Sequence, residues 1–104
     1  MNYTNSIREY LNRDIEAFSK LNIEEINNAM EAIYHAWNRG ATIFVMGNGG
    51  SAATASHMVC DFNKGVSLNT GRKFKFVCLN DNIPIITAIA NDISYDKIFE
   101  LQLK

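Results

Sequence analysis

The sequence predicts an α/β fold with a doubly wound parallel sheet, of which this chain carries the first part behind two N-terminal helices. Apolar residues with helical spacing fill residues 1–40. A short apolar run at residues 42–46 is then followed at once by a glycine cluster and a helical segment. A second strand and further helical segments follow, and this alternation is typical of parallel sheets with helices on their faces.

Residues 1–40 are expected to form two amphipathic helices, because apolar residues recur at three- and four-residue steps. The first stripe is Tyr3, Ile7, Tyr10, Leu11, Ile15, Phe18 and Leu21, and the second is Ile23, Ile26, Met30, Ile33, Tyr34 and Trp37. Asn22 with Glu25 resembles a capping box at the start of the second helix. Gly40 marks its end. We expect this helical pair, residues 1–40, to serve packing and oligomerisation.

Residues 41–104 change pattern and are expected to form the first part of an α/β domain. Residues 42–46 are β-branched and apolar, which predicts a strand buried on both faces. The later expected elements are a helix over 52–63 that ends at Gly65, a strand over 73–79, a helix over 84–90 capped by Asp81 or Asn82, and a helix from Ser94 to Lys104. Two parallel strands cannot cover these helices, so we expect the domain to be incomplete in this chain.

Composition and charge exclude several kinds of protein. The chain has 104 residues, a formal net charge of -1 and ten scattered Lys and Arg residues, which argues against a nucleic-acid partner. No apolar run approaches the ~20 residues of a membrane span, and the first residues lack the features of a signal peptide. Cys60 and Cys78 lack metal-site or disulfide spacing. We therefore expect a cytoplasmic protein with no membrane partner.

Gly47–Ser51, with the sequence GNGGS, joins the first strand to the next helix. Such a loop offers free backbone N–H groups and the positive end of the helix dipole, and glycines let a ligand approach the backbone. Ser51 either caps the helix or donates its hydroxyl to a substrate oxygen. We expect an anion site here, and the alternative is a tight turn without a ligand.

The glycine pattern also admits a dinucleotide. Gly47, Gly49 and Ala52 satisfy the fingerprint G-x-G-x-x-A, which expects an acidic residue ~20 positions later at the end of the second strand. Asp61 comes too early for that role and Asp81 comes late. A P-loop is excluded, because no Lys-Ser or Lys-Thr follows the glycines. A dinucleotide-binding domain of the Rossmann type thus stays an alternative that lacks its expected acid.

Residues 45–57, VMGNGGSAATASH, resemble the first motif of the phosphoheptose isomerases of the SIS (sugar isomerase) domain family. Residues 79–92, LNDNIPIITAIAND, and residues 95–99, YDKIF, resemble the next block of that family. The resemblance spans nearly the whole chain. It implies the SIS-domain fold, with a five-stranded parallel sheet in flavodoxin-like strand order. It also implies a domain of nearly twice this length that usually forms a homotetramer.

The resemblance implies a phosphosugar substrate, sedoheptulose 7-phosphate, and aldose–ketose isomerisation through an enediol in the complete protein. Residues 1–104 alone are expected to be inactive. The implied substrate-binding residues are Asn48, Gly49, Gly50, Ser51, Asp61, Asn91 and Asp92. His57 and Asp61 would help to bind zinc together with a Gln and a His of the missing half. Asp61 is the candidate catalytic base, since isomerisation needs a group that removes a proton next to the carbonyl.

The spacing of His57 and Asp61 supports a shared site, because residues i and i+4 lie on one face of a helix. Imidazole and carboxylate suit zinc, although a catalytic zinc commonly has three protein ligands. Cys60 is a further donor, expected to face the core instead. The alternative is a hydrogen bond between the two side chains on the helix surface.

Two departures from the family pattern bear on these expectations. Asp61 stands where the family has Glu, which affects the zinc geometry, and residues 63–65 read Asn-Lys-Gly where Gly-Arg is usual, which affects the substrate. A phosphosugar-sensing SIS module without activity stays a second alternative. Regulators of that kind usually add a basic helix-turn-helix segment, which this sequence lacks.

Overall fold

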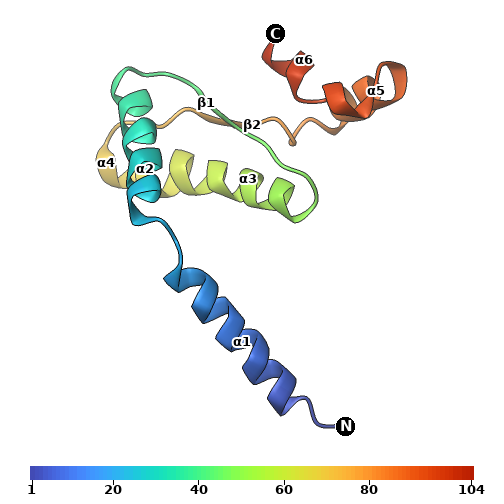
Figure 1. Cartoon of the computed structure of the whole chain (residues 1–104). Helices are drawn as coiled ribbons and strands as arrows, with labels where there is room; N and C mark the ends of the chain where they lie inside the picture. The colour runs from blue at the N-terminus through green and yellow to red at the C-terminus, as the bar shows by residue number, and fades with distance from the viewer. The chain divides into compact units, whose positions relative to one another are not determined.

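The computed structural model describes all residues 1–104 and contains one two-stranded parallel sheet and several helical segments (Figure 1). The elements are α1 (Thr4–Ser19), α2 (Ile23–Asn38), β1 (Ile43–Val45), α3 (Gly50–Cys60), a π-helical segment (Asp61–Val66), α4 (Ser67–Thr70), β2 (Phe76–Cys78), α5 (Ile83–Asp92), a 3-10 turn (Tyr95–Lys97) and α6 (Glu100–Leu103). The predicted α/β class is confirmed, because two parallel strands alternate with helices. None of the helices is both long and apolar enough to cross a membrane.

The chain forms two compact units, Met1–Ala32 and Ile33–Lys104. The first contains α1 and most of α2, so the boundary falls within α2, whereas the change of sequence pattern comes at Ala41. The predicted start of α2 is confirmed, since the Asn22 carboxamide accepts the backbone N–H groups of Glu24 at 3.0 Å and Glu25 at 3.2 Å.

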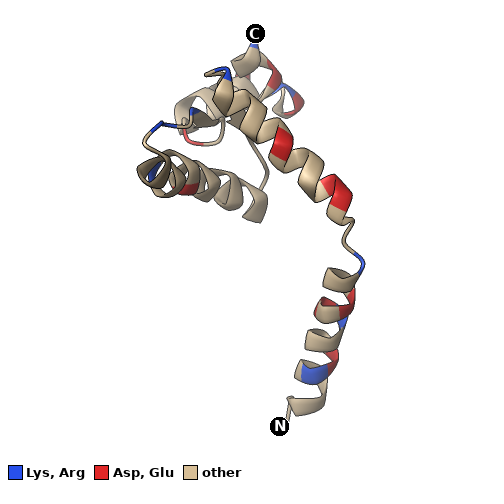
Figure 2. Cartoon of the chain, turned by 90° about the vertical axis from the view of Figure 1, so that its left-hand side faces the viewer, with Lys and Arg blue, Asp and Glu red and all other residues tan.

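The apolar stripe of α1 is uncovered. No residue of this helix is buried, and Phe18 is 73% exposed. Both acidic and basic residues lie along the same helix (Figure 2). An amphipathic helix gains most of its stability from packing of its apolar face. We therefore expect the apolar face of α1 to pack against another surface.

The sheet pairs β1 with β2 in the register Ile43↔Phe76, Phe44↔Val77 and Val45↔Cys78. Phe76 is 2% exposed, whereas Phe44 and Val77 are 46% and 42% exposed. Because alternate residues of a strand face opposite sides, only one face is covered, and α3 runs along it (Figure 1). The prediction of a first strand buried on both faces is therefore wrong for this chain.

The two edges of the sheet differ. The Asn63 carboxamide donates to the Phe76 carbonyl and accepts the Phe76 N–H, both at 2.9 Å, which are the bonds that a neighbouring strand would make. Asn63 thereby closes the outer edge of β2. The outer edge of β1 has no partner strand. A further strand can therefore join the sheet only beside β1.

The expected helix end at Gly65 is wrong. Helical turns continue through the π-helical segment and α4, and the chain turns out of the helix at Gly71, which has φ +69°. Packing explains the difference, because Phe62 stacks on Phe76 with ring centroids 4.3 Å apart and meets Phe74 edge-on at 5.1 Å. This aromatic contact outweighs the low helix propensity of glycine.

The last segment also differs from its prediction. Asn82 caps α5, as expected, by accepting the Ile85 N–H at 3.1 Å. The single helix expected from Ser94 onward is instead a 3-10 turn followed by α6. Ile98 lies between them and is only 3% exposed, so the chain bends to bury this side chain.

Candidate functional site

The glycine loop begins where β1 ends, and two features fix its shape. A Cβ at Gly47 would lie 2.6 Å from the backbone of Ser51, so only glycine fits there. Gly47 donates its N–H to the Asn80 carboxamide at 2.9 Å, and Asn80 donates back to the Gly47 carbonyl at 2.7 Å. Asn80 follows β2, so the ends of both strands hold the loop. Gly49, with φ +56°, then turns the chain into α3.

The N-terminus of α3 presents free donors, as the sequence predicted. Gly49 occupies the N-cap position without a side-chain bond, and the N–H groups of Asn48, Gly49 and Gly50 donate to no acceptor in the chain. Ser51 does not cap the helix, so that alternative is wrong. Its hydroxyl makes no hydrogen bond and its backbone N–H donates to the Asn48 carbonyl at 3.0 Å. The loop is therefore a set of donors suited to an anion or a sugar oxygen.

A tyrosine from a later part of the chain contacts this loop. The Tyr95 hydroxyl donates to the Asn48 Oδ1 at 2.7 Å. Neither Tyr95 nor Asn80 was expected from the sequence to contribute to the site. Signals existed for both, because Asn80 directly follows a strand and Tyr95 opens the segment YDKIF that carries the family resemblance.

Asn91 and Asp92 are the last residues of α5, and both are exposed. The Asn91 carboxamide donates to the Asp92 carboxylate at 2.9 Å, which leaves acceptor oxygens on both side chains. No hydrogen bond links either residue to the glycine loop. The nearby Tyr95 supplies the only side-chain connection from this corner to Asn48.

His57 of α3 and Asp61, which opens the π-helical segment after α3, lie on one helix face, as their spacing predicted. The Nε2 of His57 lies 3.4 Å from the Asp61 Oδ1, and the two side chains are 74% and 65% exposed. They line a shallow hollow of about 430 Å³ together with Ala53, Thr54 and Met58. Imidazole and carboxylate are thus available to a ligand from solvent.

A second hollow, of about 440 Å³, continues the first along α3. Its walls come from β1 and α3, and it is lined by Phe44, Val45, Met46, Ser51, Thr54, Ala55 and Met58. Thr54 and Met58 line both hollows. The two hollows adjoin at these side chains, and together they form the depression along α3 that extends from Ser51, beside the glycine loop, to the His57–Asp61 pair.

The chain by itself does not complete a zinc site. No group of three or more His, Cys, Asp and Glu side chains lies close enough to hold a metal ion. Cys60 is exposed, and Ala55 is the buried residue of α3. The prediction that Cys60 faces the core is therefore wrong. His57 and Asp61 are two donors of the kind zinc takes, whereas a catalytic zinc commonly has three.

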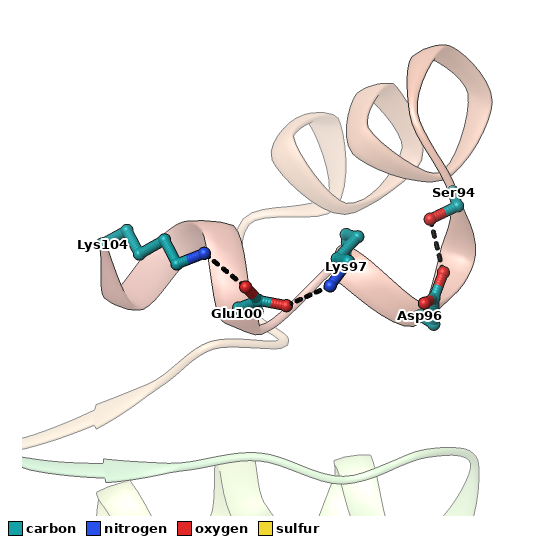
Figure 3. A network of polar contacts seen from close by, with 5 residues as sticks. All are labelled: Ser94, Asp96, Lys97, Glu100 and Lys104. Atoms are coloured by element: carbon teal, nitrogen blue, oxygen red, sulfur yellow. Dashed lines mark hydrogen bonds and ion pairs between the residues drawn. The ribbon is translucent and has the colours of Figure 1, made fainter.

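Charged groups brace the segment that carries Tyr95 (Figure 3). Hydrogen bonds from Lys104 and Lys97 lower the pKa of Glu100, and the Glu100 contact raises the pKa of Lys97. The Ser94 hydroxyl lowers the pKa of Asp96. These contacts lie on both sides of Tyr95 in the chain and restrain the turn that presents it.

Comparisons with known proteins agree with the sequence motifs. The SIS domain family matches residues 2–104. A probable phosphoheptose isomerase from Thermoplasma acidophilum is 38% identical over 97 residues, which are 93% of this chain and 53% of the relative. A phosphoheptose isomerase from Thermodesulfovibrio yellowstonii is 39% identical over 90 residues, covering 86% of this chain and 44% of the relative.

A solved structure that is similar to this chain is also a phosphoheptose isomerase. The phosphoheptose isomerase GmhA from Neisseria gonorrhoeae superposes with a TM-score of 0.84 and 26% identity, over 98% of this chain and 53% of that one. The chain thus spans about half the length of the relatives it matches.

Proposed function

We propose that this chain forms the phosphosugar-binding part of a phosphoheptose isomerase. The proposal starts from its family, since the chain belongs to the SIS domain family. The observation that carries this proposal is the loop of unpaired N–H groups at the start of α3, in a chain that is similar to phosphoheptose isomerases over most of its length. The proposed substrate is sedoheptulose 7-phosphate, and the proposed reaction is its isomerisation to an aldose phosphate.

The substrate is proposed to lie in the depression along α3. The N–H groups of Asn48, Gly49 and Gly50 would bind its oxygens at one end, with the free Ser51 hydroxyl beside them. The acceptor oxygens of Asn91 and Asp92 would bind sugar hydroxyls. Donors therefore meet one part of the substrate and acceptors the other, which suits a molecule that carries both carbonyl or phosphate oxygens and hydroxyl groups.

Asp61 is proposed as the catalytic base. Isomerisation moves a proton between two adjacent carbons and shifts the carbonyl the opposite way through an enediol, so it needs no oxidant. An exposed carboxylate on the wall of the depression can take that proton and return it. His57, 3.4 Å away, is placed to orient the carboxylate.

Zinc enters the proposal only together with ligands from outside this chain. His57 and Asp61 would supply two donors, and a third must come from another segment or subunit. Bound zinc would polarise the substrate carbonyl. The steps assigned above to Asp61 and His57 do not depend on it.

The position of the acid after β2 weighs against the dinucleotide alternative. Asp81 comes later in the chain than the acid that the dinucleotide fingerprint expects about 20 positions after its glycines. The Asp81 Oδ1 accepts the Ser56 hydroxyl at 2.9 Å, which ties the end of β2 to α3 and leaves the Oδ2 free. No comparable observation favours the sensing module.

The test is an isomerase assay on the full-length protein with sedoheptulose 7-phosphate, following formation of the aldose phosphate. Titration with NADH, read by its fluorescence, is the parallel measurement. Turnover without NADH binding supports the proposal. NADH binding without turnover would favour the dinucleotide alternative, and sugar-phosphate binding without turnover would favour the sensing module.

A further inference from the structure

The Tyr95–Asn48 hydrogen bond determines what the Asn48 side chain offers to a ligand. A carboxamide has an acceptor oxygen and a donor NH₂ group. In this chain the Asn48 Oδ1 accepts the Tyr95 hydroxyl at 2.7 Å, and the Nδ2 has no partner. The bond uses one of the two lone pairs of the Oδ1, and the two free N–H groups of the Nδ2 add to the three unpaired backbone N–H groups of the loop.

Several contacts restrain the segment around Tyr95. The Lys97 N–H donates to the Ser94 carbonyl at 3.2 Å, and the Ser94 hydroxyl donates to the Asp96 carboxylate. Lys97 donates to the Glu100 carboxylate at 2.5 Å (Figure 3). The intervening Ile98 is 3% exposed. Tyr95 thus projects from a braced turn, which is what holding a binding side chain in one rotamer requires.

The geometry points to Tyr95 as a positioning residue for the substrate site, which holds the Asn48 carboxamide so that its N–H groups face acceptor oxygens of the phosphosugar. This inference rests on the proposed function. It divides the site by polarity, with donors at the glycine loop and acceptors at Asn91 and Asp92. Tyr95 acts through Asn48 and needs no contact with the substrate.

The test is Tyr95→Phe in the full-length protein, with sedoheptulose 7-phosphate as the probe for calorimetric Kd and for KM and kcat. The change removes the hydroxyl and keeps the ring. Tyr10→Phe is the matched control, because Tyr10 and Tyr95 are each 60% exposed and the Tyr10 hydroxyl makes no hydrogen bond. Loss of one hydrogen bond predicts that Kd and KM rise about three- to tenfold in Tyr95→Phe and stay unchanged in Tyr10→Phe.

A double-mutant cycle separates positioning from a merely structural role. If Tyr95 acts through Asn48, Tyr95→Phe should add less than about twofold to the Kd of Asn48→Ala. A structural role would instead lower the Tm and add its effect to that of Asn48→Ala. A Kd unchanged by Tyr95→Phe, or an additive cycle, would overturn the inference.

The two proposals fail in different ways. Wild-type protein that binds sedoheptulose 7-phosphate, with a Tyr95→Phe variant that binds equally well, overturns only the role of Tyr95. Wild-type protein that neither binds nor isomerises this sugar phosphate overturns the proposed function, and the inference falls with it.

Discussion

At the scale of single residues, the glycine loop depends on two positions that restrain it in different ways. Gly47 leaves room for the Ser51 backbone, and Asn80 holds both polar groups of the Gly47 backbone. The importance of the glycines was predictable from the sequence, because a glycine run between a strand and a helix is typical of loops that bind anionic groups. The Asn80 contact was not predictable, since it depends on how the ends of two strands meet.

Gly47→Ala should destabilise the protein, whereas Gly50→Ala should not. A Cβ at Gly47 would overlap the Ser51 backbone, at a cost of about 1–3 kcal/mol, while a Cβ at Gly50 meets nothing within 4 Å. Gly50→Ala also restricts the unfolded chain, which favours folding by up to about 1 kcal/mol. Urea denaturation of the two variants checks this, and equal stability would show that the loop is not tightly packed at Gly47.

Asp61→Asn should abolish turnover of sedoheptulose 7-phosphate while leaving its Kd within roughly tenfold, because the charge is lost and the shape is kept. Steady-state kinetics and calorimetry together measure both quantities. A kcat equal to that of the wild type would show that Asp61 is not the base. Asp61→Glu is the companion variant, and weaker zinc binding in it than in the wild type would indicate a site adapted to the shorter side chain.

At the scale of elements, helix and strand types were predictable and several ends were not. Apolar spacing predicts α1, α2 and α3, since amphipathic periodicity is a local property. The continuation past Gly65 depends on Phe62 stacking on Phe76, a contact between segments that no local pattern reveals. The break in the last helix likewise follows from the burial of Ile98.

Asn63→Ala should lower the free energy of unfolding by about 1–3 kcal/mol, because it leaves the N–H and C=O of the buried Phe76 unpaired. Asn69→Ala is the control, since Asn69 is exposed and its side chain makes no hydrogen bond. Chemical denaturation of both variants provides the measurement. Equal effects in the two would contradict the role of Asn63 as the closed edge of β2.

The α6 region should loosen in acid. The folded pKa of Glu100 is lowered by Lys104 and Lys97, so its contribution is present above the ordinary glutamate value of 4.5 and is lost as pH falls through the lower folded pKa. Amide chemical shifts of α6 should therefore move toward coil values at acid pH. Glu100→Gln should remove that pH dependence, and an unchanged titration in this variant would contradict it.

At the scale of the whole molecule, the chain leaves surfaces that it cannot cover. The face of the sheet with Phe44 and Val77 is open, the outer edge of β1 is unpaired, and the stripe of α1 is exposed. Incompleteness was predictable from the small number of strands. The closed edge at Asn63 was not, and it limits growth of the sheet to the β1 side.

We propose that α1 and α2 pack against copies of themselves in a homo-oligomer, as the family resemblance implies. Sedimentation velocity at micromolar concentration should then show a mass well above that of one chain. Phe18→Glu should shift the protein toward monomer, because it places a charge in the apolar stripe, whereas Arg13→Glu on the same helix should not. A monomer at every concentration would contradict the proposal.

The central claim is that a phosphosugar binds at the glycine loop at the start of α3. The most direct measurement is an amide ¹H–¹⁵N NMR titration of the full-length protein with sedoheptulose 7-phosphate and, separately, with NADH. The account predicts that the sugar phosphate causes its largest shifts at Asn48, Gly49 and Gly50, whose N–H groups are unpaired without it, and that NADH leaves them in place. Saturable shifts confined to residues away from this loop, or shifts at the loop with NADH alone, would contradict it.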